Sequence, residues 1–156
     1  MAGEQKELVL TRVFDAPREL VYRVWTDPKH LAQWWGPHHF TNPVCEIDVR
    51  PGGAMLIHMR WPDGRISKMT GVFQEVVPQE RLVFISSALD DQGQPLFEVL
   101  TTVEFHEEKG KTKQIVRARV LKSTTQAAPY LAGMEPGWTQ TLERLADYVA
   151  RTRAEN

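Results

Sequence analysis

Hydrophobic and polar positions follow different periods along the chain, and these periods predict its secondary structure. Residues 7–14 are rich in β-branched and aromatic side chains, which is typical of a strand. Between residues 40 and 121, short runs of alternating apolar and polar residues are separated by turn residues, which predicts further strands. Near the C-terminus, apolar residues recur at helical spacing: Trp138, Leu142, Leu145 and Val149. This spacing predicts a long amphipathic helix at about 134–151 that buries these four side chains.

Two short helices are predicted between the first strand and the remaining strands. The first begins near Pro17, because proline is favoured in the first turn of a helix. Its apolar face is formed by Leu20, Val21, Val24 and Trp25. The second helix follows the same kind of start signal at Asp27 and Pro28, and it ends at Gly36 and Pro37.

The central region reads as a meander of antiparallel strands. In the strand predicted at 54–61, Met55, Ile57 and Met59 share one face, because side chains alternate across a strand. Further strands are separated by hairpin-length turns and are predicted at 66–77, 81–89, 96–106 and 113–121. Residues 122–134 are small and polar, which predicts a loop or a loose lead-in to the C-terminal helix. The order of elements predicts an α+β fold, with helices against one face of an antiparallel sheet.

Composition and charge exclude several classes of function. The chain has 19 Lys and Arg residues and 20 Asp and Glu residues, whereas nucleic-acid binding would need a basic excess. Cys45 is the single cysteine, so no intramolecular disulfide can form and a reducing compartment is favoured. Neither a signal peptide nor an apolar run of membrane-spanning length is present. We therefore expect a soluble cytoplasmic protein, monomer or homodimer, with neither nucleic acid nor membrane as a partner.

Four motifs in the same order resemble those of bacterial members of the family named after the activator of heat-shock-protein ATPase homologue. They are TRVFDAPRELVYRVWTDPKHLAQWWGP at 11–37, DVRPGGAMLIHMRWPDG at 48–64, GVFQEVVPQERLVF at 71–84 and GMEPGWTQTLERLADYV at 133–149. The similarity covers about residues 7–150. It implies the helix-grip fold of the START and birch-pollen-allergen (SRPBCC) superfamily, in which a curved antiparallel sheet of about seven strands surrounds a long C-terminal helix. A single domain at 7–151 is then expected, with flexible tails at 1–6 and 152–156.

In such folds the sheet and the C-terminal helix enclose a cavity, which the two short helices close at one end. The resemblance and the strand alternation together predict a set of apolar residues that line it. The predicted ligand-binding residues are Trp34, Trp35, Met55, Ile57, Met59, Phe73, Phe84, Val103, Phe105, Trp138, Leu142 and Leu145. Methionines in this set favour an adaptable lining, since Met fills irregular space.

The stretch KHLAQWWGPHHF at 29–40 concentrates tryptophan and histidine. Trp34 and Trp35 are neighbours about 100° apart around a helix, so we expect one to pack beneath the sheet and the other to lie near the cavity entrance. His38 and His39 follow a Gly-Pro break, where adjacent side chains point in opposite directions. Since no metal-binding spacing occurs, the histidines are predicted to lie on the surface, and neither a metal nor another cofactor is expected.

Candidate catalytic residues are sparse. Glu75 stands two positions after Phe73 in a strand and could face the cavity, where burial would raise its pKa, but a solvent-facing Glu is the commoner case. Ser86 and Ser87 lack the context of a nucleophile elbow. Cys45 is typical of a buried, unreactive thiol. No catalytic residue is therefore assigned.

Three functions remain open at this stage. The protein could bind a small hydrophobic or aromatic molecule in the cavity, which we favour. It could instead be a cyclase- or hydrolase-type enzyme that uses a cavity carboxylate such as Glu75. Thirdly, it could be a co-chaperone-like interaction module with a chaperone as partner and a role in the stress response. The co-chaperones that the family is named after carry an additional N-terminal domain, whereas about six residues precede the first predicted strand here.

Overall fold

One antiparallel sheet and the helices packed against it make up the described chain. The computed structural model describes residues 7–125 and 128–155. In chain order, the elements are β1 (Glu7–Phe14), α1 (Arg18–Thr26), α2 (Pro28–Trp34), β2 (Thr41–Ile47), β3 (Ala54–Arg60), β4 (Ile66–Val77), β5 (Arg81–Leu89), β6 (Pro95–Glu108), β7 (Lys111–Ser123), α3 (Ala128–Ala132) and α4 (Met134–Glu155).

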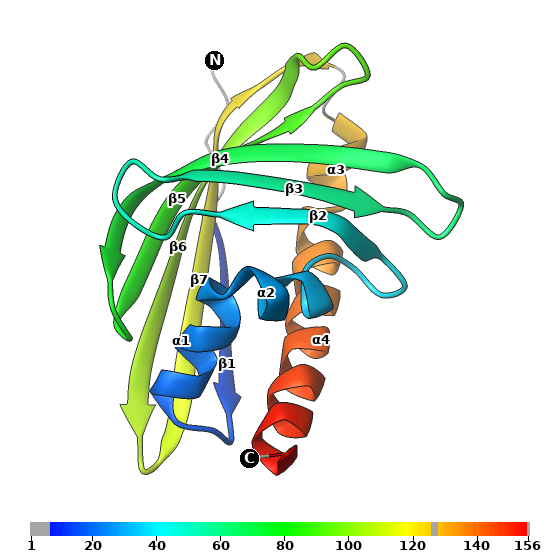
Figure 1. Cartoon of the computed structure of the whole chain (residues 1–156). Helices are drawn as coiled ribbons and strands as arrows, with labels where there is room; N and C mark the ends of the chain where they lie inside the picture. The colour runs from blue at the N-terminus through cyan, green and yellow to red at the C-terminus, as the bar shows by residue number, and fades with distance from the viewer. Residues whose placement is uncertain (1–6, 126–127, 156) are drawn as a thin grey trace.

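The sheet has seven strands in the order β1-β7-β6-β5-β4-β3-β2, and each neighbouring pair is antiparallel. Successive strands from β2 to β7 are neighbours, and β1 joins the sheet beside β7. The sheet is strongly curved, and α4 lies along its open concave side with α1 and α2 at one end (Figure 1). This arrangement confirms the predicted α+β helix-grip fold.

Local sequence explains how the two short helices begin and end. Pro17 is the N-cap residue of α1, whose four predicted apolar residues are all buried. At the start of α2, the Asp27 side chain accepts a hydrogen bond from the backbone N–H of Lys29, and Pro28 occupies the first turn. Gly36 follows the helix with a φ of 96°, a left-handed conformation that favours glycine. The chain therefore turns sharply after Trp35.

The core lies between the concave face of the sheet and one side of the helices. Leu142, Leu145 and Val149 of α4 are each at most 2% exposed, as predicted from their helical spacing. Trp138, which was predicted to be buried with them, is only partly buried and packs against the edge of this core. The core is thus continuous along the later turns of α4 and becomes less complete near the start of the helix.

The sequence prediction for 122–134 was wrong in part. Strand β7 continues to Ser123, because Lys122 and Ser123 pair with residues of β6. Helix α3 occupies Ala128–Ala132, where a loop or a loose lead-in was expected. Helix α4 also continues to Glu155, beyond the predicted end at 151, while the predicted N-terminal tail lies outside the described residues.

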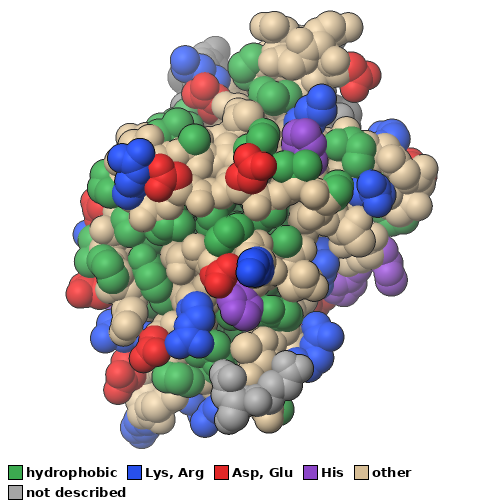
Figure 2. All heavy atoms as spheres, in the orientation of Figure 1, with side chains coloured by type: hydrophobic (Ala, Val, Ile, Leu, Met, Phe, Trp, Pro, Cys, Tyr) green, Lys and Arg blue, Asp and Glu red, His purple; other side chains and the backbone are tan. Residues whose placement is uncertain are grey.

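Charged side chains of both signs are interspersed on the face shown in Figure 2, and neither sign forms a continuous patch there. This distribution agrees with the formal net charge of −1. Within residues 7–125 and 128–155, no helix is long and apolar enough to cross a membrane.

Candidate functional site

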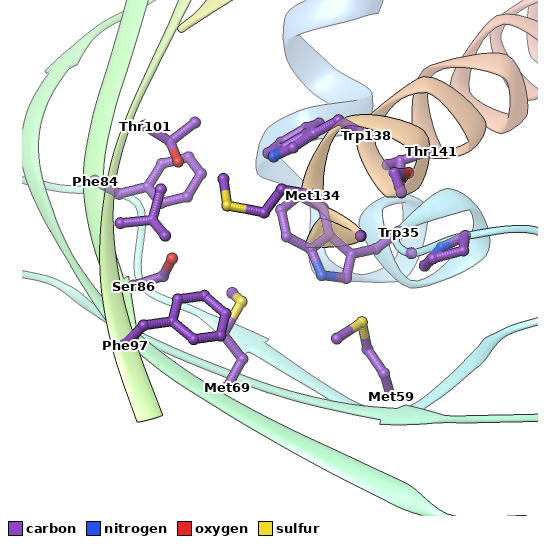
Figure 3. A pocket seen from close by; sticks show the side chains of 15 residues that line it. Trp35, Met59, Met69, Phe84, Ser86, Phe97, Thr101, Met134, Trp138 and Thr141 are labelled. Carbon is purple, nitrogen blue, oxygen red and sulfur yellow. Dashed lines mark hydrogen bonds between the residues drawn. The ribbon is translucent and has the colours of Figure 1, made fainter. Parts of the chain in front are cut away.

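A pocket of about 190 Å³ opens between the first turns of α4 and the concave face of the sheet. Figure 3 shows the sheet residues on one side and the residues of α4 and the α2–β2 loop on the other. The loop contributes Trp35, Gly36 and Pro37. The sheet contributes Met59 from β3, Met69 from β4, Phe84 and Ser86 from β5, and Phe97, Val99 and Thr101 from β6. The described lining residues include no charged side chain, so the pocket is predominantly apolar.

The helical wall of the pocket follows from residue spacing in α4. Met134, Trp138 and Thr141 are separated by four and three residues and therefore lie on one face of the helix. Gly133 and Gly137 alternate with them along this wall and add no side chains. A Cβ atom added at Gly137 would come no closer than 3.9 Å to the Pro37 ring, so space remains between α4 and the loop.

Four of the five tryptophans form one cluster, which lies at and behind the pocket wall. The ring centroids of Trp35 and Trp138, which both line the pocket, are 5.6 Å apart and meet edge to face. Trp25 contacts both of them, and Trp34 contacts Trp25 with a centroid separation of 4.8 Å. Trp34 is fully buried, and its indole N–H donates to the backbone carbonyl of Val24. Such aromatic contacts hold the pocket wall in a defined geometry.

Arg144 of α4 fixes the loop that forms the other part of this wall. Its guanidinium group donates hydrogen bonds of 2.9 to 3.1 Å to the backbone carbonyls of Gln33, Trp35, Gly36 and Pro37. These carbonyls lie at or just beyond the C-terminus of α2, where a cation is favoured by the helix dipole. Burial lowers the pKa of Arg144 from its ordinary value, but an arginine side chain stays charged in proteins.

The structure brings four of the twelve predicted ligand-binding residues to this pocket: Trp35, Met59, Phe84 and Trp138. The other eight lie away from its walls, in the packed core: Trp34, Met55, Ile57, Phe73, Val103, Phe105, Leu142 and Leu145. The difference arises because α1, α2 and the middle of α4 fill the closed end of the fold with side chains, so that space remains beside the start of α4.

Several lining residues were missed by the sequence analysis: Met69, Ser86, Phe97, Val99, Thr101, Met134 and Thr141. Periodicity could have found some of them. Ser86 is two positions after Phe84, Thr101 is two positions before Val103, and Met134 is one helical turn before Trp138. Ser86 and Thr101 are polar, whereas apolar side chains are the ones expected to line a cavity of this fold.

Glu75 does not line the pocket. The pairing of β4 with β5 shifts between Phe73 and Glu75, so that Phe73 pairs with Phe84 but Glu75 pairs with Val83. The extra residue is a β-bulge, which reverses the faces of the residues that follow. The Glu75 side chain is consequently about half exposed and forms an ion pair with Arg81.

The remaining candidates for chemistry also lie outside the pocket. Burial and the neighbouring Glu46 raise the pKa of the Cys45 thiol to about 11, so the thiol stays protonated and unreactive at neutral pH. His38 and His39 are exposed, as predicted, and His38 Nε2 lies 3.0 Å from a carboxylate oxygen of Glu143. No group of three or more potential metal ligands occurs among the described residues.

Comparison with known proteins identifies relatives of the whole domain. The family model of the Activator of Hsp90 ATPase homolog 1-like protein matches residues 15–150. None of the curated proteins with which the chain was compared matches it.

Solved structures of bacterial proteins have the same fold. A protein from Chromobacterium violaceum is 31% identical, with a TM-score of 0.71, and the match covers 92% of this chain and 96% of that protein. A protein from Nitrosomonas europaea is 26% identical, with a TM-score of 0.79 and coverage of 95% and 96%. The AHSA1 protein from Silicibacter pomeroyi is also 26% identical, with a TM-score of 0.78 and coverage of 94% and 99%.

Proposed function

The chain belongs to the family of Activator of Hsp90 ATPase homolog 1-like proteins, and from this premise and the pocket we propose that it binds a small apolar molecule. The site is the pocket between α4 and the sheet, which we call the Trp35–Trp138 pocket. The observation that carries the proposal is an open, predominantly apolar space bordered by aromatic side chains that contact one another. Sites for small molecules are commonly concave and lined by apolar and aromatic residues.

The volume of the pocket indicates how large a part of the ligand can lie between its walls. At about 190 Å³ it is smaller than the pockets of roughly 300–1,000 Å³ that hold drug-sized molecules. An apolar cavity of about 150 Å³ is large enough for benzene. The walls can therefore hold a part of a ligand about as large as one ring, and the rest of a larger molecule would extend out of the open side.

The lining residues support binding in preference to catalysis. The described walls contain hydroxyl, thioether and indole groups but no carboxylate, histidine or cysteine that could act as a general base or nucleophile. Glu75, the carboxylate on which the enzyme hypothesis rested, faces away from the pocket toward Arg81.

A thermal-shift screen of one-ring aromatic and alicyclic compounds tests the proposal. A ligand at 100 times its dissociation constant should stabilise the fold by about 2.7 kcal/mol, which corresponds to a rise in Tm of about 5–10 °C for a domain of this size. Val99, which is 6% exposed and lines the pocket, provides the blocking variant Val99→Phe. This variant should fold and lose the shift.

The matched control is Val72→Phe, because Val72 is 42% exposed on β4 and lies away from the pocket. It should keep the full response to the ligand. If no one-ring compound raises the Tm of the native protein, or if both variants respond equally, binding in this pocket is excluded.

A further inference from the structure

Two hydroxyl groups interrupt the apolar sheet wall of the Trp35–Trp138 pocket. Ser86 and Thr101 lie on this wall, across the pocket from Trp35 and Trp138 (Figure 3). Thr101 is only 2% exposed. Within the described part of the chain, neither hydroxyl makes a hydrogen bond to another residue, and neither oxygen is among the fully buried side-chain atoms that lack a partner. Both hydroxyls border the open pocket and are therefore available to a ligand.

Strand pairing places the two hydroxyls close together. Ser86 is directly opposite Val99, and Thr101 is opposite Phe84, so Ser86 and Thr101 are diagonal neighbours on adjacent strands. Diagonal positions of this kind are on the order of 7 Å apart between backbones, and their side chains approach more closely. One polar group of a ligand can therefore reach one or both hydroxyls while the rest of the ligand stays among apolar side chains.

Of the other polar side-chain groups in the described lining, only the indole N–H groups of Trp35 and Trp138 lack a protein partner, and these can donate a hydrogen bond but not accept one. The third hydroxyl, that of Thr141, donates to the backbone carbonyl of Gly137 at 2.8 Å. No Lys, Arg or His is among the described lining residues, so an ionised carboxylate or phosphate would lose its water without gaining a counter-charge. The pocket consequently disfavours charged ligands.

We infer that the pocket selects a neutral one-ring molecule with a single hydroxyl or carbonyl oxygen, which forms a hydrogen bond with Thr101 or Ser86. This inference rests on the proposed function and adds the chemical class of the ligand. Hydroxyl side chains both donate and accept, so they can pair with either kind of oxygen.

Two probe compounds of nearly equal shape, 4-methylphenol and 1,4-dimethylbenzene, distinguish the polar contact from simple apolar burial. They differ by a hydroxyl in place of a methyl group, and their affinities can be measured by calorimetry. Native protein should bind the phenol more tightly. The variant Thr101→Val should weaken phenol binding by about five- to tenfold, as expected for one lost hydrogen bond, and leave binding of the hydrocarbon unchanged or stronger. The ionised 4-methylbenzoate should not bind.

The chain offers matched controls at neighbouring positions. Thr102 and Ser87 lie on the opposite face of the same strands and are not among the pocket residues. Thr102→Val and Ser87→Ala should therefore leave the preference between the two probes unchanged, whereas Ser86→Ala should reduce it. Tm values measured without ligand check that all four variants are folded.

The possible outcomes separate this inference from the proposed function. If both probes bind and their ratio is unaffected by Thr101→Val and by Ser86→Ala, the hydrogen-bonding inference is wrong and apolar binding stands. If neither probe nor any other one-ring compound binds, both proposals fail. Tight binding of 4-methylbenzoate would also overturn the inference, because it would require a positive charge that the described lining lacks.

Discussion

A single arginine connects the C-terminal helix to one wall of the pocket. Arg144 donates hydrogen bonds to the four backbone carbonyls of Gln33, Trp35, Gly36 and Pro37. A planar guanidinium group can reach several acceptors at fixed angles, whereas the ammonium group of lysine is a compact point charge. The position of Trp35 at the pocket therefore depends on a residue that is not itself a pocket residue.

Replacing Arg144 with Met should destabilise the protein by about 1.5–3 kcal/mol, the usual contribution of a hydrogen bond to a charged group. Arg144→Lys should retain part of this stability, because the charge remains near the C-terminus of α2. Urea denaturation followed by circular dichroism would measure both effects. A midpoint for Arg144→Met equal to that of the native protein would show that solvent replaces these hydrogen bonds without loss.

The long helix α4 is the element that the sequence predicts most clearly. Leu142, Leu145 and Val149 recur with the helical period and are all buried in the structure. Leu145 is 0% exposed and belongs to the main hydrophobic core. The C-terminal helix is thus a structural part of the domain as well as a wall of the pocket.

Truncation of Leu145 to Ala should lower the free energy of unfolding by roughly 2–5 kcal/mol, since it removes buried methyl groups and leaves a cavity. The exposed residue Asp147 on the same helix provides the control. Asp147→Ala should change stability by no more than about 0.5 kcal/mol. Equal denaturation midpoints for the two variants would contradict a core position for Leu145.

Helices and strands were predictable where the spacing of apolar residues stayed regular. They were not predictable where this spacing was interrupted. The β-bulge between Phe73 and Glu75 changes which face Glu75 occupies, and nothing in the local sequence marks the extra residue. Strand β7 likewise extends through Lys122 and Ser123 because β6 provides pairing partners, although these residues are polar. Such features depend on the neighbouring strand and not on the segment itself.

The lining of the pocket depends on packing between elements. A space between the sheet and the C-terminal helix was expected, but side-chain packing decides which part of that space stays open. Ile57 and Phe105, both predicted to line the cavity, are at most 1% exposed and lie in the core, away from the pocket walls. Side-chain volumes can be read from the sequence, but the distances between the strands and helices that carry these side chains cannot.

The whole molecule groups four tryptophans in one cluster that reaches the pocket and holds Trp61 apart from them, and this division gives an optical test of binding. Trp35 and Trp138 line the pocket, and Trp25 and Trp34 lie in contact with them. Trp61 is outside this cluster and stacks with the guanidinium group of Arg65 at 3.9 Å. Occupation of the pocket should therefore change the surroundings of the cluster and leave those of Trp61 unchanged.

Intrinsic fluorescence should change in a saturable way when a one-ring ligand is added to the native protein, because the indole rings at the pocket lose contact with water. Trp138→Phe should reduce the amplitude of this change, since it removes an indole that touches the ligand space. Trp61→Phe should lower the total emission and keep the ligand-induced amplitude. If Trp61→Phe instead abolished the response while Trp138→Phe preserved it, the ligand would have to bind near Trp61, and the start of α4 would no longer be the binding site.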